Sequence, residues 1–590
     1  MKQPLVYLSI AFAMGCVSML IFISNNVLGA VIAASFLIVM LFDINKYYFI
    51  LITLFFLAGA CTSWNYFNFE PNSKHFKNVR VIEMDKQYIL GNFSGRKVVF
   101  YGSFDKIKNG QKLYLTGEFK KNLNIKKGII GTVQVEAIVN CKEDYITKIY
   151  NFKDSLFSKF QEHLNGEEAA FVMAICFGDT KELSLDQKTD FQKLGVIHAI
   201  SVSGFHLAII YKIFEALLGI YPGIVLSVLY VIFTGAQPST VRAFIMIFIL
   251  KLSKKANKNY DVFSSIGLSA LLILLVSPYY ILDIGFNLSY LSTLSIVIFN
   301  KPIMKTLTSL PKKLSESISV SLSSQILSLP YAAFSINNIS TGFLMGNIVL
   351  LPLYTIIVII GNIAMCFSSI EFIFSLICKL IKIVMLSIQG ATLLLLKVCL
   401  NSQYFTLWEG WILTLFIISI LLAKSGIKKS KYVIATAVVM LMFNHYNFWP
   451  RIIYINSGKS HDSIVIKYKY STIIVTGEGS SRTLSNYKNQ FGVTRVISTK
   501  DGPNRFLLGN KYIIDASELK TYNQKYKTIE LTISSKYNKI LFTRNKVPAT
   551  CKGVYDIIKL PKDKEVPPLD FRFENIYSYY IFKDNTIRIK

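Results

Sequence analysis

Long apolar runs separated by short polar loops dominate the pattern of hydrophobic and polar positions along the chain. Such runs are long enough to cross the hydrocarbon core of a bilayer as helices, and about thirteen of them are expected. They lie at about 5–24, 28–42, 47–63, 196–217, 222–236, 240–252, 262–280, 285–299, 316–336, 341–365, 378–398, 406–424 and 431–447. The pattern predicts a polytopic α-helical membrane protein.

Two polar stretches interrupt this pattern, one from 65 to about 165 and one from 450 to 590. In the first, the segments KVVFYGSF, QKLYLTGEF and GTVQVEAIV alternate apolar and polar side chains between Gly-containing turns, which is typical of half-buried strands. We therefore expect a small β-barrel. The predicted domains are N-terminal membrane spans (1–64), the β domain (65–150), an amphipathic helical connector (151–195), a transmembrane domain (196–449) and a β-rich C-terminal domain (450–590).

The distribution of lysine predicts the orientation in the membrane. The short loops KLSKKANK (251–258), KPIMKTLTSLPKK (301–313) and KSGIKKSK (424–431) are basic and should face the cytoplasm, together with Lys2 and Lys46. Because successive spans cross the membrane in opposite directions, both soluble domains are then expected outside the cytoplasm. We expect a multi-pass protein of the cell (inner) membrane with extracytoplasmic domains.

The chain of 590 residues has a formal net charge of +29, and the basic loops do not account for all of it. Residues 65–150 carry 15 Lys and Arg against 8 Asp and Glu, and residues 451–590 carry 25 against 12. Basic faces interleaved with Tyr and Phe suit a polyanion, although anionic lipid headgroups or compositional bias explain them equally well. The eight cysteines are scattered without a CxxC pair, which argues against a disulfide framework or a zinc knuckle.

One apolar segment, GVIHAISVSGFHLAII (195–210), contains His198, Ser203, Gly204 and His206. Ionisable residues at membrane depth usually face a cavity or a pathway. Two histidines eight positions apart are not aligned on one unbroken helix, and the Ser-Gly pair between them can interrupt the helix and expose backbone groups. A lone histidine here would favour structural packing, whereas this combination favours a functional site.

Further polar residues accompany this segment. In TGAQPSTVRAFIM (234–246), Pro238 is placed to begin a helix, with Arg242 one turn inside it. Arg242 can bind a phosphate, a headgroup or the carboxylate of Asp283, so a structural ion pair and a substrate contact are both open. Gln325 and Asn347, taken singly, favour contacts between helices.

These segments resemble the ComEC competence family, the inner-membrane channel that takes up single-stranded DNA during natural transformation. HAISVSGFH is similar to its H-x4-S-G-x-H signature, and GAQPSTVRAF, LDIGFNLSYLSTL and the segment from SQILSLP to NIVLLP follow in the family's order over about 165–365. In the family the small β domain is OB-like and is proposed to contact DNA. The resemblance implies a DNA pathway made by the matching residues and their neighbour Asp283: His198, Ser203, Gly204, His206, Pro238, Arg242, Asp283, Gly285, Gln325 and Asn347.

The resemblance implies a channel for single-stranded DNA that is not an enzyme and needs no cofactor or metal. Many members end in a metallo-β-lactamase-like domain, but beyond residue 450 this chain has only His461, too few ligands for a two-metal centre. We therefore expect a truncated, metal-free or β-rich tail. No Walker P-loop occurs, so the expected partners besides DNA and the bilayer are a DNA receptor, a separate nuclease and a cytoplasmic ATPase, with oligomerisation left open.

Two alternatives remain at this point. A transporter of another polyanion, such as a polysaccharide or a lipid-linked envelope precursor, needs the same basic faces and polar pathway. A membrane-embedded enzyme that uses His198 or His206 as acid or base is less favoured, because no paired carboxylate or nucleophile motif lies near them.

Overall fold

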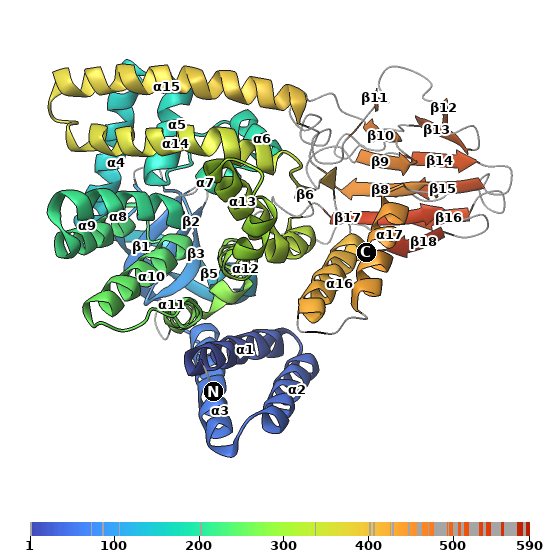
Figure 1. Ribbon diagram of the computed structural model, residues 1–590, viewed down its shortest axis with the longest axis horizontal. Helices are drawn as coiled ribbons and strands as arrows, with labels where there is room; N and C mark the ends of the chain where they lie inside the picture. Colours follow the sequence, from blue (N-terminus) through green and yellow to red (C-terminus); the bar gives the residue numbers. More distant parts are fainter. Residues whose placement is uncertain are drawn as a thin grey trace. The chain divides into compact units, whose positions relative to one another are not determined.

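The structure is a computed structural model, and it consists of two compact units (Figure 1). The first comprises Met1–Phe191, Gly195–Ser328 and Phe343–Lys397, and the second comprises Gln192–Leu194, Leu329–Gly342 and Val398–Lys590. The described residues are 3–71, 74–84, 88–104, 107–200, 203–336, 338–399, 403–404, 407–424, 426, 430–446, 449–456, 463–469, 471–476, 493, 495–498, 505–508, 512–518, 530–534, 539–543, 556–559, 575–581 and 586–589.

Every apolar run predicted from the hydropathy pattern contains a long helix. These helices are α1 (Pro4–Ser24), α2 (Asn26–Asp43), α3 (Lys46–Phe67), α8 (Gly204–Leu218), α9 (Ile220–Phe233), α10 (Pro238–Lys255), α11 (Val262–Val276), α12 (Ile284–Thr306), α13 (Lys312–Ser335), α14 (Phe343–Cys366), α15 (Glu371–Val398), α16 (Leu407–Lys424) and α17 (Ser430–His445). Among the described residues, α1, α3 and α14 are both long and apolar enough to cross a membrane, and α2, α9, α11 and α16 are apolar but shorter. The helices are therefore confirmed, whereas thirteen crossings stay a prediction.

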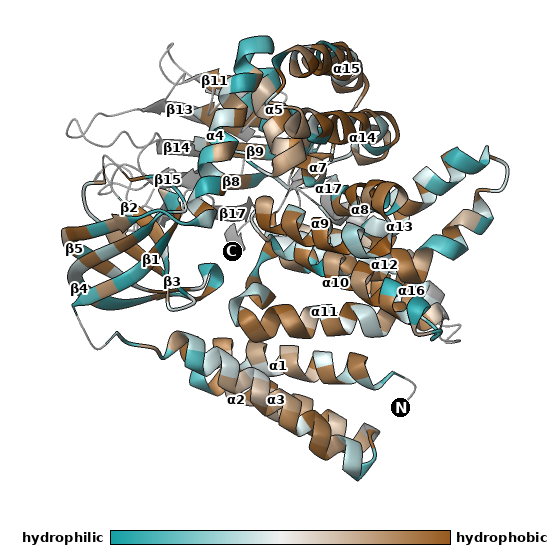
Figure 2. Ribbon diagram, turned by 90° about the vertical axis from the view of Figure 1, so that its left-hand side faces the viewer, coloured by the Kyte–Doolittle hydropathy of each residue, from teal (hydrophilic) through white to brown (hydrophobic). Residues whose placement is uncertain are grey.

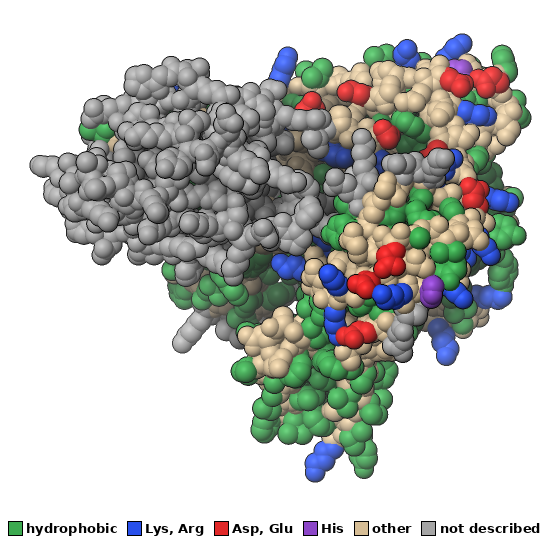
Figure 3. Space-filling model, turned by 180° about the vertical axis from the view of Figure 1, so that it is seen from behind, with side chains coloured by type: hydrophobic (Ala, Val, Ile, Leu, Met, Phe, Trp, Pro, Cys, Tyr) green, Lys and Arg blue, Asp and Glu red, His purple; other side chains and the backbone are tan. Residues whose placement is uncertain are grey.

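The surface of the N-terminal helices has the character expected of a membrane segment. Figure 3 shows hydrophobic side chains gathered over α1–α3 at the bottom of the view. Val27, Phe42 and Tyr47 are 75%, 86% and 83% exposed, which would be costly in water and is favourable against lipid tails. Lys46 at one end of α3 and Trp64 at the other are residue types that prefer the two membrane interfaces.

Two glycines bring α1 and α3 unusually close together. A Cβ on Gly15 would lie 2.0 Å from the carbonyl oxygen of Phe56, and one on Gly59 would lie 2.1 Å from that of Phe12. Neither position accepts a side chain, because in both cases the obstacle is backbone of the other helix. Small residues at helix contacts are a common device in membranes, where packing replaces the hydrophobic effect between helices.

The predicted β domain is a closed five-stranded barrel. Its strands are β1 (His75–Met84), β2 (Tyr88–Phe93), β3 (Arg96–Tyr101), β4 (Lys112–Asn124) and β5 (Ile129–Lys142), in the order β1-β2-β3-β5-β4. Neighbouring strands are antiparallel except β3 and β5, which pair in parallel. Val79, Val98, Phe100 and Leu115 are among the fully buried residues that fill its core.

The barrel is fixed to the helices by a cluster of aromatic residues. The Tyr66 hydroxyl at the end of α3 donates to the Gly128 carbonyl at 2.9 Å, and its ring lies 5.2 Å from that of Tyr279 in the short 3-10 helix η2 (Pro278–Leu282). A Cβ on Gly128 would lie 2.5 Å from the Tyr279 ring, so this turn depends on glycine. Leu20 of α1 belongs to the same core.

The connector between the barrel and α8 differs from the prediction in one helix. It contains α4 (Tyr145–His163), α5 (Gly166–Phe177), α6 (Leu185–Lys193) and the single turn α7 (Ile197–Ile200). α4 is amphipathic as predicted, but α5 is buried on all sides from Glu168 to Phe177. The prediction of an amphipathic helix is wrong for α5, because neighbouring helices cover it: Phe171 packs on Tyr354 and Cys176 contacts α14.

The contacts between helices show which ends lie together. Gln3 at the start of α1 bonds to Asp261 at the start of α11, and Glu215 pairs with Lys251 near the ends of α8 and α10. The opposite ends of α1, α3 and α11 meet the barrel. We call these the basic end and the barrel end of the first unit, and Figure 2 shows the barrel and the N-terminus on opposite sides.

The second unit carries the C-terminal strands. The strands of one sheet follow the order β11-β10-β9-β8-β17-β18, and those of the other follow β12-β13-β14-β15-β16. The first sheet contains β8 (Arg451–Asn456), β9 (Ser463–Tyr468), β10 (Ser471–Thr476), β11 (Arg495–Ser498), β17 (Asn575–Ile581) and β18 (Thr586–Ile589). The second contains β12 (Arg505–Leu508), β13 (Tyr512–Glu518), β14 (Glu530–Ser534), β15 (Lys539–Thr543) and β16 (Asp556–Lys559). His461 lies outside the described residues, so the predicted metal-free tail stays a prediction.

Candidate functional site

The helix is interrupted between the two histidines, as the sequence predicts. α7 ends at Ile200 and α8 begins at Gly204, with Ser203 in extended conformation before it. The Ser203 backbone N–H donates to His206 Nδ1 at 3.0 Å, and the Ser203 hydroxyl lies 3.0 Å from the same nitrogen. Because Nδ1 accepts the backbone hydrogen bond, a neutral His206 carries its proton on Nε2.

The two histidines differ in their surroundings. His206 is 1% exposed and caps α8, whereas His198 is exposed and its Nδ1 lies 3.1 Å from the Gly195 carbonyl oxygen. His198 is therefore the accessible member of the pair, and His206 is the member that the fold holds in place.

Gly204 lets α8 approach α10. A Cβ there would lie 2.9 Å from the Ala243 Cβ and 3.6 Å from Arg242 Nη2. The glycine serves the packing of two helices, and it places the start of α8 beside the Arg242 guanidinium.

Arg242 is a buried cation that binds α12. It is 8% exposed, its Nη1 donates to the Ser289 carbonyl at 2.6 Å and to the Thr293 hydroxyl, and its guanidinium carbon lies 5.4 Å from the centre of the Tyr290 ring. Among the described residues its Nε has no hydrogen-bond partner. A buried guanidinium with an unused donor is a costly arrangement unless an anion completes it.

Asp283 does not pair with Arg242. Its carboxylate accepts the Phe286 backbone N–H at 2.7 Å and so caps the N-terminus of α12. The structural ion pair considered from the sequence is therefore wrong, because Asp283 lies before the first turn of α12 whereas Arg242 contacts its second and third turns. No carboxylate lies within 4.0 Å of Arg242 in the part of the chain that the structure describes.

The remaining predicted residues lie on the same group of helices. Pro238 is at the first turn of α10, as its position predicts, and Gly285 is exposed in the first turn of α12. Asn347 is 6% exposed, and its amide nitrogen donates to the Ser321 hydroxyl at 3.4 Å, while its oxygen has no partner among the described residues. Gln325 lies half-buried on α13.

The structure thus brings together one part of the predicted set. Gly204 and His206 on α8, Arg242 on α10 and the start of α12 meet near the barrel end of the first unit. Asn347 contacts α13, and no contact joins it to Arg242 among the described residues. The arrangement offers an accessible imidazole, a buried guanidinium and the first turns of α8, α10 and α12, all of which favour an anion.

Three partners of these residues were not predicted. Ser289, Thr293 and Ser321 lie within apolar helices, where serine and threonine most often bond to their own backbone. Ser289 and Thr293 lie inside the motif LDIGFNLSYLSTL, but nothing in the sequence indicates that they contact Arg242, because each contact joins two helices. Tyr290, between Ser289 and Thr293, has no distinguishing signal either.

Comparison with known proteins finds relatives of the segment that holds this site. Residues 175–430 match the model of the family described as "Competence protein". ComE operon protein 3 of Bacillus subtilis (strain 168) is 29% identical over 241 residues, which are 39% of this chain and 30% of that protein. An uncharacterized protein of Aquifex aeolicus (strain VF5) is 30% identical over 158 residues, 26% of this chain and 38% of that protein.

A further relative is the uncharacterized protein MG316 homolog of Mycoplasma pneumoniae, 28% identical over 163 residues, 26% of this chain and 42% of that protein. The chain thus spans less than half the length of each of these curated relatives. No solved structure matches it. The resemblance predicted from the motifs is confirmed: residues 175–430, which hold every predicted site residue, match the competence protein family.

Proposed function

We propose that this protein is a channel that takes up single-stranded DNA across the cytoplasmic membrane during natural transformation. The family match supports a role in competence, and one observation supports the chemistry. Arg242 is buried without a carboxylate partner among the described residues, and its Nε is unused there. A phosphodiester passing this point supplies the anion that the guanidinium lacks.

The histidines complete the proposed contact. His206 holds the start of α8 through Nδ1, which leaves Nε2–H as a donor, and His198 is exposed nearby. Neutral donors beside one buried cation bind a phosphate weakly enough for it to leave again, as conduction requires. We propose these residues as binding groups of a pathway and assign no catalytic role to them.

The barrel is proposed to receive the strand. The closed five-stranded barrel supports the proposal of an OB-like domain, a common nucleic-acid-binding module. On the outer face of β1 and β4, the Lys77 ammonium lies 5.7 Å from the centre of the Tyr114 ring, and the Tyr114 hydroxyl lies 3.4 Å from His75 Nδ1. Cations beside an aromatic ring suit the phosphates and bases of a single strand.

The orientation follows from the two ends of the first unit. Lys46, Lys254 and Lys301 lie at the basic end, so this end is proposed to face the cytoplasm and the barrel end the outside. The Arg242 site then lies in the outer part of the membrane, on the same side as the barrel. A receptor, a separate nuclease and a cytoplasmic ATPase are the partners proposed for strand delivery and pulling.

The test is uptake of labelled DNA by a transformable strain whose own copy is deleted and replaced by variants of this chain. Arg242→Gln should lower entry about 10- to 100-fold, because a hydrogen bond to a charged group contributes about 1.5–3 kcal/mol. Arg242→Lys should retain part of the DNA entry, since the positive charge remains while the planar guanidinium with its paired donors is lost. Lys212→Gln is the matched control, an equal charge change at an exposed residue of α8.

Normal uptake by a stably expressed Arg242→Gln protein would exclude Arg242 from the pathway. Unchanged transformation of the deletion strain, with altered envelope composition, would favour the transporter of another polyanion, because Arg242 does not distinguish one phosphate from another.

A further inference from the structure

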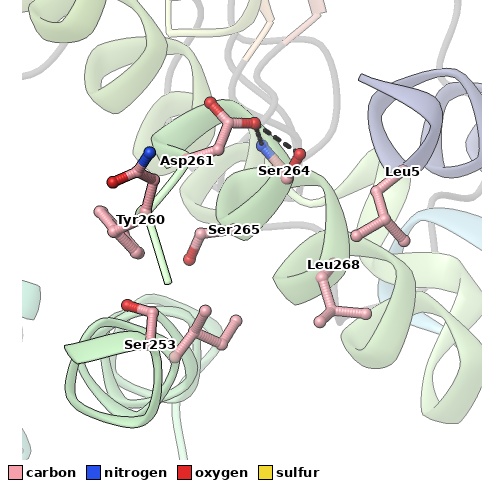
Figure 4. Close-up of a pocket in the computed structure, with 9 residues that line it drawn as sticks. Leu5, Ser253, Tyr260, Asp261, Ser264, Ser265 and Leu268 are labelled. Atoms are coloured by element: carbon pink, nitrogen blue, oxygen red, sulfur yellow. Dashed lines mark hydrogen bonds between the residues drawn. The ribbon is translucent and has the colours of Figure 1, made fainter. Parts of the chain in front are cut away.

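A cavity of about 190 Å³ lies at the basic end of the first unit, away from the Arg242 site. It is formed where the start of α1, the end of α10 and the start of α11 meet (Figure 4). Leu5, Ile249 and Leu268 line it with apolar surface. Because α1 is a candidate membrane span, this end of α1 is at the level of the membrane boundary.

One polar side chain in the cavity lacks a partner. Ser265 is 2% exposed, and its hydroxyl has no hydrogen-bond partner among the described residues. In Figure 4 this hydroxyl points into the space between α10 and α11. A buried hydroxyl without a partner is unfavourable, so a ligand that brings an oxygen to this point is stabilised.

The one carboxylate of the cavity is already occupied. Asp261 Oδ2 accepts the Ser264 backbone N–H at 2.9 Å and Oδ1 accepts the Gln3 amide at 3.1 Å, so this side chain caps α11 and binds α1. The helix begins directly after it, and its carboxylate oxygens accept from donors of the protein. It does not offer the cavity a site for a cation.

The charge around the cavity is positive. Lys254, Lys255 and Lys258 follow one another at and beyond the end of α10 and are all exposed. Lys255 lies over the Tyr221 ring at 4.6 Å and bonds its hydroxyl. In the described part of the chain no carboxylate lies within 4.0 Å of the Lys254 or Lys258 ammonium group. Both lysines adjoin lining residues of the cavity in the sequence, Lys254 next to Ser253 and Lys258 next to Asn259.

We propose that this cavity binds one anionic phospholipid. The upper part of an acyl chain packs on Leu5, Ile249 and Leu268, an ester oxygen accepts from Ser265, and the headgroup lies against Lys254 and Lys258. One water takes about 30 Å³ of liquid, so the cavity has the volume of about six waters, which suits a chain segment and not a whole lipid. Apolar walls, a buried donor and a basic rim together are the features of a site for an acidic lipid.

The test uses the full chain purified and exchanged into nanodiscs of phosphatidylglycerol or of phosphatidylcholine, with native mass spectrometry to count retained lipids. The unmodified protein should retain one phosphatidylglycerol and no phosphatidylcholine. The double variant Lys254→Gln/Lys258→Gln should retain phosphatidylglycerol about 30-fold more weakly, since each lysine near the surface contributes about 1 kcal/mol. Leu268→Trp should remove retention by filling the cavity.

The matched control is Lys301→Gln/Lys305→Gln, an equal charge change at exposed lysines of α12 at the same end. It should keep the lipid. Equal retention of both lipids by the unmodified protein, or equal loss in the control, would overturn the proposal. Inorganic phosphate added in place of lipid should leave the melting temperature unchanged, and a stabilisation by phosphate alone would point to a free-anion site instead. No DNA is needed, so the result is independent of the channel proposal.

Discussion

The His206 side chain has two proposed roles, one for each ring nitrogen. Its Nδ1 accepts the Ser203 backbone N–H and so holds the start of α8, and its Nε2–H is free to donate to a phosphate. His206→Ala removes the acceptor at the start of α8 and should lower stability by about 0.5–2 kcal/mol, the usual contribution of a cap. His206→Asn keeps an acceptor near Nδ1 and should retain the stability, but it removes the Nε2–H donor. We expect both variants to lose DNA entry, and the melting temperature in detergent to fall only for alanine.

The comparison of these two variants decides what the histidine does. Normal DNA entry by His206→Asn would show that capping is the whole role of His206 and would take it out of the proposed pathway. His163→Ala serves as a control for loss of a histidine. His163 is the last residue of α4 and pairs with Glu371 of α15, so it belongs to neither α7 nor α8.

At the residue scale, sequence reasoning predicted which residues matter better than what they contact. The break between His198 and His206 follows from Ser203 and Gly204, and Pro238 begins α10 as proline at a first turn does. For Arg242 the sequence left an ion pair with Asp283 and a substrate contact both open, and the structure does not form the ion pair. A carbonyl, a hydroxyl and an aromatic ring surround Arg242 instead, and these occur throughout apolar helices.

Between elements, the contact of α8 with α10 allows a test by compensating substitutions. Gly204→Ala places a methyl group 2.9 Å from the Ala243 Cβ and should destabilise the protein by about 1–3 kcal/mol, as overpacking does. Ala243→Gly removes that obstacle, so the double variant should recover most of the loss beyond the small cost of glycine in a helix. Melting temperatures of the four proteins give the coupling.

If the two substitutions were additive, the short distance between α8 and α10 would not be the reason for glycine at this position. Gly390→Ala on α15 is the matched control, because a Cβ there meets nothing within 4 Å.

The joint between the barrel and α4 predicts a dependence on pH. Arg80 donates to the Asp144 carboxylate at 2.6 Å and Lys112 lies 3.1 Å from it, and the bond to Arg80 holds the pKa of Asp144 well below its usual range. The contribution to stability is thus present above the unfolded pKa of about 3.9 and is lost as the pH falls toward the lowered value. The stability difference between wild type and Asp144→Asn should therefore narrow between about pH 5 and pH 3.

Thermal unfolding of both proteins at several pH values measures that difference. Glu118→Gln is the control, since its pair with Lys74 at 2.8 Å is exposed and should contribute little. A constant difference down to pH 3 would contradict the assignment to charge, and the loss would then come from the helix cap that Asp144 also provides.

At the scale of elements, the sequence predicted helices and the barrel because each leaves a pattern within its own segment. Alternation in residues 97–139 marks strands, and apolar runs mark helices. The order of the strands leaves no such pattern, since the parallel pairing of β3 with β5 joins separate segments. α5 was misjudged because Glu167 and Glu168 at its start resemble a polar face, whereas Glu168 is buried as part of a capping box with Asn165.

For the whole molecule, the two ends of the first unit predict which surfaces reagents reach. Cys141 is an exposed cysteine on β5 of the barrel. In a background with the other cysteines replaced, a maleimide that cannot cross membranes should label Cys141 in intact cells. Lys255→Cys, without Cys141, should be labelled only after the cells are opened.

Mass shifts of the purified protein report both labels. In the proposed orientation the barrel and Lys255 lie on opposite faces of the membrane, so labelling of both positions in intact cells would contradict it. Val98→Cys, buried in the barrel, is the control for access without unfolding.

The packing of Tyr279 on Gly128 also bears on how the protein is made. The ribosome completes the barrel, together with α1 and α3, well before it reaches η2. During that interval the Tyr66 ring and the Gly128 turn lack their contacts with Tyr279 of η2, whereas the hydrogen bond from Tyr66 to Gly128 can already form. Tyr279 is synthesised only after α11, so the ring that covers the Gly128 turn comes from a much later part of the chain. The contact between Tyr279 and Gly128 therefore joins the barrel to a segment that is made well after it.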